Sequence, residues 1–294
     1  MEEVIDKIPI IDCHSHLIYS DKLSYPWMNT YPFSLLKKQQ EESHYKIDQS
    51  SLPIKSLIFM EVGAENSLDE TKFIENLSDQ NNTIISGIIA NYPMKKDKNY
   101  LIDYLEKISH NKLVGVRYLL QTTKDNNTYL ENDFSEKLQI LKRYSLPFHI
   151  CIYQNQLPNA VKLVERHPDI LFFLDHLGKP FEGGENFELW KDNIKKLSRM
   201  DNLYMKLSPG FCYPDNYLNR SEPYIEYIVN NFKNEKMLVG SDYGCGSGNV
   251  SFAEWMDLVK KVMLRLKLNQ EEVENIFYKN AEKVYNLNNR RTKF

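Results

Sequence analysis

The sequence predicts an α/β fold and, within that class, a single (β/α)8 TIM-like barrel. Three observations support this prediction. About eight short β-rich segments recur along the chain, segments with helical spacing separate most of them, and no low-complexity linker divides the 294 residues. Alternating strands and helices indicate βαβ units, and eight such units in a chain of this length favour a closed barrel over an open doubly wound sheet. We therefore expect residues 1–294 to form one barrel domain.

The expected strands are short and mostly apolar. Segments 56–60 (Ser-Leu-Ile-Phe-Met) and 170–174 (Ile-Leu-Phe-Phe-Leu) contain too few polar residues for a sheet with one face exposed to solvent. They are typical of parallel strands that are covered on both faces. The expected strands are residues 9–13, 54–62, 83–90, 113–119, 147–153, 170–176, 203–208 and 237–242.

Apolar residues recur at helical spacing in the segments between these strands. The expected helices are residues 67–78, 100–109, 134–144, 157–166, 187–197 and 224–232. The C-terminal segment 252–287 is also helical in pattern, with Trp255, Leu258, Val262 and Leu266 on one face. We interpret that face as one that packs against the rest of the fold.

The longest segment without a clear strand spans about residues 20–51. It follows the first strand, so we expect a long loop with a short helix over the barrel mouth, where the C-terminal ends of the strands open. Two interpretations of its Tyr25-Pro26-Trp27 cluster stay open. The cluster forms a wall of the substrate site, or it packs the loop onto the barrel rim.

Composition excludes several classes of partner. Lys and Arg number 37 against 40 Asp and Glu, and the formal net charge of −3 gives no positive field for a phosphate backbone. Apolar runs such as residues 84–90 are far shorter than the roughly 20 residues that a membrane span needs, and the acidic start has no secretory pattern. We expect neither a nucleic-acid nor a membrane partner, and a cytoplasmic location; the sequence does not indicate an oligomeric state.

The first expected strand ends in a His-x-His motif, formed by His14 and His16. Because side chains on a strand alternate, both imidazoles are expected on one side, with Asp12 beside them. Two imidazoles near a strand end can bind a divalent metal ion or polarise a substrate oxygen. The alternative is a chance pair of core histidines.

Further polar residues fall at the ends of other expected strands. His149 lies in the fifth, His176 closes the sixth and Asp242 closes the eighth. In barrel enzymes catalytic side chains come from the C-terminal ends of several strands, so these groups are expected to converge with the His-x-His pair. For Asp242 the alternative is a carboxylate that caps a following turn.

Arg117 and Glu61 end the fourth and second expected strands. A guanidinium at a barrel mouth can bind a substrate carboxylate or a developing oxyanion with two hydrogen bonds. The alternative for Arg117 is a structural ion pair with a neighbouring acid. Glu61 is a candidate to contact the substrate directly, or to contact a residue that binds the substrate.

These residues, in this order, resemble the amidohydrolase superfamily, and most closely its branch of sugar lactonases and pyrone-dicarboxylate lactonase. The most specific motif is Asp-His-Leu-Gly-Lys-Pro at residues 175–180, whereas His-x-His alone is weak. The resemblance extends over nearly the whole chain. It includes Tyr-Pro-Trp at 25–27, Gly-Val-Arg at 115–117, Tyr-Met-Lys-Leu-Ser at 204–208 and Phe-Tyr-Lys-Asn-Ala at 277–281.

The resemblance implies an enzyme that opens a small sugar-acid lactone, an aldono-1,4- or 1,5-lactone. Asp242 is then the general base that takes a proton from the attacking water. His14 and His16, with Asp242, would bind one divalent ion, for which zinc is the first expectation. His176 would bind the metal or hold the scissile carbonyl, and His149 would join it or contact substrate.

Members of this branch differ in whether they need a metal, so catalysis without one stays an alternative. A second reading is a zinc-dependent decarboxylase of the same superfamily, which uses the same strand-end residues. A third is a binding barrel without turnover, because a fold alone does not establish a function.

Overall fold

Eight parallel strands form the centre of the structure, and each pairs with the next one along the chain. This computed structural model describes residues 2–30, 34, 36, 39–108, 111–123, 125–182, 184–210, 216–245 and 250–288. The strands are β1 (Ile10–Ser15), β4 (Ile54–Met60), β5 (Ile85–Asn91), β6 (Leu113–Leu119), β7 (Phe148–Cys151), β8 (Phe172–Leu174), β9 (Leu203–Leu207) and β10 (Met237–Val239).

The barrel is closed by backbone hydrogen bonds between β1 and the segment that follows β10. The amide of Asp242 donates to the His14 carbonyl at 2.8 Å, and the amide of His16 donates to the Tyr243 carbonyl at 2.8 Å. Ser15 and Tyr243 form a parallel bridge between these bonds. The predicted (β/α)8 barrel is therefore confirmed.

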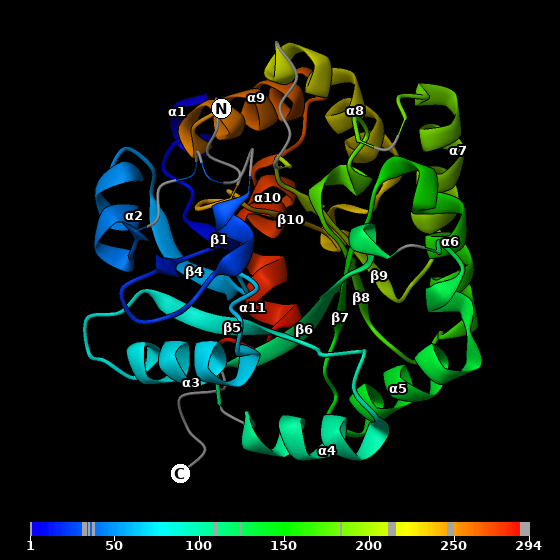
Figure 1. The fold of residues 1–294 in the computed structure, drawn as a ribbon. Coiled ribbons are helices and arrows are strands. Elements are labelled where there is room, and N and C mark those ends of the chain that lie inside the picture. The colour runs from blue at the N-terminus through cyan, green and yellow to red at the C-terminus, as the bar shows by residue number, and fades with distance from the viewer. Residues whose placement is uncertain are drawn as a thin grey trace.

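Helices lie around the outside of the strands (Figure 1). They are α1 (Glu2–Ile5), α3 (Ser67–Ser78), α4 (Lys98–Lys107), α5 (Asn132–Arg143), α6 (Leu157–Arg166), α7 (Phe187–Leu197), α8 (Tyr217–Asn231), α9 (Phe252–Arg265), α10 (Gln270–Glu274) and α11 (Asn280–Val284). A π-helical turn, Asn275–Lys279, joins α10 to α11. The bounds predicted for α3, α6 and α7 are confirmed.

The predicted start of α8 is wrong. We expected the helix to begin after Pro223, but it begins at Tyr217 and contains the proline. A proline inside a helix removes one backbone hydrogen bond and crowds the carbonyl four residues earlier, but this helix continues through it.

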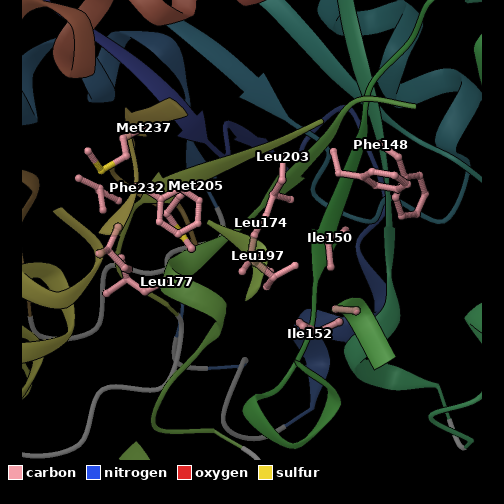
Figure 2. Close-up of a cluster of buried hydrophobic side chains, with 14 of the residues drawn as sticks. Phe148, Ile150, Ile152, Leu174, Leu177, Leu197, Leu203, Met205, Phe232 and Met237 are labelled. Carbon is pink, nitrogen blue, oxygen red and sulfur yellow. The ribbon is translucent and has the colours of Figure 1, made fainter. Parts of the chain in front are cut away.

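Side chains alternate between two layers of the core. On β7, Phe148 and Ile150 face the helices, and together with Leu174 they belong to the apolar layer drawn in Figure 2. His149 on the same strand faces the barrel interior, where its ring stacks on Phe173 with a centroid separation of 4.5 Å. The barrel interior is therefore partly polar at the position of His149.

The loop after β1 has more structure than we predicted. It contains the expected short helix, α2 (Glu42–Asp48), which is confirmed. It also contains a two-stranded antiparallel ribbon, β2 (Ile18–Tyr19) with β3 (Gln39–Gln40), and a 3-10 turn at Pro26–Asn29. Strands of two residues are too short to show an alternating pattern, so the sequence did not reveal them. Part of the segment, residues 31–33, 35, 37 and 38, lies outside the described residues.

Within the described ranges, none of the helices has the length and apolar character that a membrane crossing requires.

Candidate active site

Residues from several strand ends line one cavity of about 320 Å³. The described lining consists of His16, Trp27, Val62, Gly63, Arg117, Leu119, Gln121, Thr122, Cys151, His176, Lys179, Asp242 and Cys245. It includes five residues that the sequence nominated, namely His16, Trp27, Arg117, His176 and Asp242. The other nominated residues, Tyr25, Glu61, His14 and His149, are buried outside this lining.

His176 and Asp242 reach the cavity through unusual backbone geometry. Strands β8 and β10 end at Leu174 and Val239, before the bounds that we predicted. His176 (φ 56°) and Asp242 (φ 54°) then adopt left-handed conformations, which are strained for residues other than glycine. The turn that holds His176 is fixed where the Trp190 indole donates to the Leu177 carbonyl at 2.8 Å. Strain of this kind often occurs at functional sites, and here it aims both side chains inward.

Three ligand-type atoms meet at the floor of the cavity. The Nε2 atoms of His14 and His16 lie 3.2 Å apart. The Oδ1 atom of Asp242 lies 3.3 Å from the His16 atom and 3.6 Å from the His14 atom. His176 Nε2 approaches the same carboxylate at 4.0 Å. The predicted convergence of these four side chains is present in the structure.

The neighbours of the two histidines limit how the rings can donate and accept. His16 Nδ1 lies 3.1 Å from the Met60 carbonyl, which can only accept, so Nδ1 carries a hydrogen. His14 lies between two groups that can only donate, an Arg117 nitrogen 3.3 Å from its Nε2 and Lys206 Nζ 3.4 Å from its Nδ1. The Asp242 carboxylate faces the Nε2 atoms of both rings, so these three groups can share a proton or a cation.

This donor set fits a divalent cation. Zinc ligands about 2.0 to 2.1 Å from the ion in tetrahedral geometry lie about 3.4 Å from one another, and the three measured separations are 3.2, 3.3 and 3.6 Å. The fixed Nδ1 hydrogen of His16 is the kind of support that orients a metal-binding imidazole. His14, His16 and Asp242 are therefore the residues that would hold a metal ion.

Two contacts with Glu61 fix the orientation of the Arg117 side chain. Its Nε lies 2.6 Å from a Glu61 carboxylate oxygen, and one of its terminal nitrogens donates to the Glu61 carbonyl at 2.9 Å. Burial lowers the pKa of Arg117, but the Glu61 carboxylate and the other negative groups nearby together raise it above its ordinary value, so the guanidinium stays charged. The ion pair that we gave as an alternative for Arg117 is thus present. It leaves one terminal nitrogen to face His14 and the cavity.

The Asp12 carboxylate accepts from the backbone amide of His14 at 3.1 Å but makes no recorded contact with either described imidazole, so the expectation that it joins the two rings was wrong. The pairing of β1 with β4 shifts register between Asp12 and Ser15, so the simple alternation of side chains breaks there. The Asp12 carboxylate instead accepts hydrogen bonds from the Ser241 hydroxyl at 2.5 Å and the Tyr45 hydroxyl at 2.9 Å. It ties β1 to the residue that precedes Asp242.

His149 lies one layer beneath the cavity. Its Nδ1 is 3.6 Å from Asp175 Oδ1, and the position that a side chain on Gly115 would occupy is blocked by its ring. Burial lowers the pKa of His149 to about 3 and that of His176 to about 4. Both imidazoles are therefore neutral near pH 7, as a metal ligand or a proton acceptor must be.

Sequence reasoning missed two buried residues next to His14. Asp175 Oδ1 lies 3.5 Å from His14 Nδ1, and Lys206 Nζ lies 3.2 Å from the same oxygen. Burial opposes ionisation of Asp175, but Lys206 and His14 hold its pKa well below the usual range. Both residues stand in motifs that we singled out, at 175–180 and 204–208. The inward alternation of Tyr204, Lys206 and Ser208 was the signal that could have found the lysine.

A comparison with protein families decides the assignment of the chain. The model of a family described as amidohydrolase matches residues 11–287. The chain belongs to the amidohydrolase family. The resemblance drawn from the strand-end histidines and Asp242 is thereby confirmed.

This amidohydrolase is similar to proteins that are named for several different activities. It is 21% identical to an L-fucono-1,5-lactonase of Burkholderia multivorans, over 85% of this chain and 87% of the relative. Its fold matches a zinc-bound amidohydrolase of Burkholderia multivorans with a TM-score of 0.81 and 19% identity, over 94% of this chain and 99% of the other.

Two more solved structures share the fold at lower similarity. A probable 2-pyrone-4,6-dicarboxylic acid hydrolase of Acinetobacter baumannii matches with a TM-score of 0.72 and 14% identity, over 94% and 99% of the two chains. A dihydroxybenzoic acid decarboxylase of Polaromonas with bound manganese matches with a TM-score of 0.68 and 12% identity, over 95% and 97%.

Proposed function

We propose that this amidohydrolase opens small sugar-acid lactones, aldono-1,4- or 1,5-lactones, by attack of water on the carbonyl carbon. The observation that carries the proposal is the position of Asp242. Its carboxylate lines the cavity and lies within 4.0 Å of nitrogen atoms of His14, His16 and His176. The similarity to an L-fucono-1,5-lactonase supports the same class of substrate.

In this mechanism Asp242 takes a proton from the attacking water as a general base. Arg117 lines the cavity, and its terminal nitrogen that does not bind Glu61 stabilises the negative charge that develops on the carbonyl oxygen. Collapse of the tetrahedral intermediate breaks the ring carbon–oxygen bond. The leaving alkoxide then receives the proton that Asp242 took from the water. The products are the open hydroxy acid and the regenerated Asp242 carboxylate.

A divalent ion on His14, His16 and Asp242 would lower the pKa of bound water and stabilise negative charge on oxygen. Zinc suits the two imidazoles and one carboxylate. His176, whose Nδ1 lies 3.0 Å from the Ser208 hydroxyl, is held at the edge of this donor set. We assign it to substrate contact, because its Nε2 lies 4.0 Å from the Asp242 carboxylate, farther than the Nε2 atoms of His14 and His16.

The charges around the cavity favour a neutral lactone over a carboxylic acid. Two cations line it, Arg117 and Lys179, and each already faces a carboxylate, Glu61 at 2.6 Å and Glu182 at 3.3 Å. Each cation of the described lining is therefore already partly neutralised by an acid, which weakens the binding of a substrate carboxylate more than a hydrogen bond to a neutral lactone. This argues against the decarboxylase reading, whose substrates are acids. A cavity of about 320 Å³ suits a single sugar ring.

The test measures acid release with a pH indicator from a panel of aldono-1,4- and 1,5-lactones, using zinc-loaded protein. We expect turnover of at least one lactone and a loss of about 10²- to 10⁴-fold in kcat in Asp242→Asn. Asp169→Asn, at an exposed ion pair with Lys142, is the matched control and should keep wild-type kcat.

Parallel assays of carbon dioxide release from aromatic and dienoic acids separate the alternatives. Carbon dioxide release without lactone opening would replace the lactonase with a decarboxylase. If neither reaction occurs and Asp242→Asn leaves ligand affinity unchanged, the protein is a binding barrel.

A further inference from the structure

We propose that Gln40, Tyr45 and Asp48, three residues of the loop after β1, are positioning residues that hold Asp242 in its left-handed conformation. This inference deepens the proposed function and rests on it for the role of Asp242 as general base. None of the three belongs to the described lining of the cavity, so each acts through the residues around Asp242.

The backbone of Asp242 needs support from its surroundings. Its φ of 54° is left-handed, and a residue other than glycine keeps such a conformation only where neighbouring groups fix it. Strand β1 supplies one set of these groups. The Asp242 amide donates to the His14 carbonyl at 2.8 Å, and the His16 amide donates to the Tyr243 carbonyl at 2.8 Å. These bonds fix the main chain at Asp242 but not the Tyr243 side chain or the Gly244 carbonyl.

The loop after β1 supplies a second set of contacts, directly after Asp242. The Tyr243 hydroxyl donates to the Asp48 carboxylate at 2.9 Å, and the Gln40 side-chain amide donates to the Gly244 carbonyl at 3.0 Å. Gln40 belongs to β3 and Asp48 is the last residue of α2, so two elements of the loop hold consecutive residues of this segment. The chain that follows Asp242 is therefore fixed by elements outside the barrel strands.

Tyr45 supports the residue before Asp242. Its hydroxyl donates to the Asp12 carboxylate at 2.9 Å, and the same carboxylate accepts from the Ser241 amide at 2.9 Å. The Tyr45 ring also packs edge-to-face against Tyr243, with a centroid separation of 5.1 Å. The loop therefore supports both neighbours of Asp242 in the chain.

Attachment of α2 to the barrel does not depend on these contacts alone. The Glu42 carboxylate accepts hydrogen bonds from the Thr83 hydroxyl and the Ile84 amide, both at 2.9 Å. These bonds fix the helix to the segment that enters β5, and not to the segment around Asp242. The contacts of Gln40 and Asp48 are therefore additional to the ones that fasten the helix.

The same loop reaches the cavity through Trp27, which belongs to the described lining. One segment thus borders the substrate site and also supports the general base. A residue that only positions Asp242 stabilises the transition state and not the bound substrate. Its loss should therefore lower kcat and leave KM nearly unchanged.

The test removes these contacts and measures hydrogen–deuterium exchange of the metal-free protein by mass spectrometry. Tyr243→Phe and Asp48→Ala each remove the bond between the hydroxyl and the carboxylate. We expect the amides of residues 241–243 to exchange about 3- to 10-fold faster in both variants. Asp48 is exposed, and Tyr243→Phe removes a single oxygen, so both variants should fold.

Two functional readouts accompany the exchange measurement. The affinity for Co²⁺, measured by competition with a chelator, should fall about 3- to 10-fold in each single variant, because Asp242 would be one of its ligands. The kcat on the best lactone should fall by a similar factor. Gln40→Met/Tyr243→Phe removes both contacts that follow Asp242, and we expect about a 10- to 100-fold loss, the product of two such effects.

Two control variants separate positioning from general stability. Asp48→Asn keeps an oxygen that can accept from the Tyr243 hydroxyl, so it should restore values close to the wild type. Tyr129→Phe removes another buried hydroxyl, which donates to the Gln156 carbonyl at 3.2 Å in the outer apolar layer. It should change none of the three readouts.

Wild-type exchange at residues 241–243 in both Tyr243→Phe and Asp48→Ala would overturn the inference. Faster exchange with wild-type Co²⁺ affinity and wild-type kcat would also overturn it, because the loop would then fasten the chain without positioning Asp242. A wild-type protein that opens no lactone would refute the proposed function alone. Exchange and Co²⁺ binding need no lactone and would still decide the inference.

Discussion

The Nε2 atoms of His14 and His16 lie 3.2 Å apart, and Asp242 Oδ1 lies within 3.6 Å of both. These three atoms have the spacing that the ligands of one tetrahedral zinc ion have. The contact therefore indicates a cation site that the Asp242 carboxylate completes.

Metal removal should destabilise the protein. We expect a chelated sample to unfold at a lower temperature than one supplied with zinc. The stabilisation should approach about 2.7 kcal/mol when free zinc is 100 times its Kd. Calorimetry with and without ZnCl₂ measures the effect, and His16→Asn should abolish it. An identical transition in chelated and zinc-supplied wild type would contradict the assigned site.

Arg117→Lys should impair the reaction more than its conserved charge suggests. Lysine cannot contact Glu61 with two nitrogens and direct a third toward the cavity. Loss of one hydrogen bond to a charged group costs about 1.5 to 3 kcal/mol, which corresponds to about a 10- to 100-fold fall in kcat/KM. Steady-state kinetics on the best lactone provides the measurement. Arg166→Lys, at an exposed bond to the Leu130 carbonyl, is the control, and equal losses in both variants would argue against a role for Arg117.

Acid should destabilise the protein through its buried histidines. The pKa of His149 is about 3 in the folded protein, against an ordinary value of 6.5, so between these pH values the unfolded chain binds a proton that the folded chain does not. Stability is then complete above about pH 6.5 and falls as the pH decreases.

His149→Leu, similar in volume but without a titrating group, should flatten this dependence. We expect the slope of the unfolding free energy between pH 6 and pH 4.5 to fall by up to about 1.4 kcal/mol per pH unit. Urea titrations at several pH values in chelator give the slope. Parallel curves for the variant and the wild type would show that His149 does not titrate on unfolding.

Gly244 should tolerate no side chain. Its φ of +88° disfavours other residues, and an added Cβ would lie 2.0 Å from the His16 carbonyl at the closure of the barrel. We expect Gly244→Ala to cost about 3 kcal/mol or more, from backbone strain and overpacking together. Gly184→Ala has a φ of +106° but nothing within 4 Å, so only the cost of backbone strain, of about 1 to 3 kcal/mol, should appear. Urea unfolding compares the two, and similar losses would contradict the steric explanation.

Regular features of the fold could be predicted because they repeat. Apolar strands such as β8 and the helical spacing of α6 set the barrel, and polar residues at strand ends marked most of the site. Irregular features could not be predicted in the same way. The register shift after Asp12 breaks the alternation that placed it beside His14. The left-handed turn at His176 leaves no mark in the hydrophobic pattern.

The hydrogen bonds of Asp12 to Ser241 have a consequence for engineering the protein. Ser241, the residue next to Asp242, also joins β1 to the segment that follows β10, the first and last strands of the barrel. Substitutions that weaken this contact should therefore lower the turnover rate before they unfold the protein. Directed evolution for higher thermal stability should therefore keep Asp12 and Ser241 unchanged and vary residues of the outer helices.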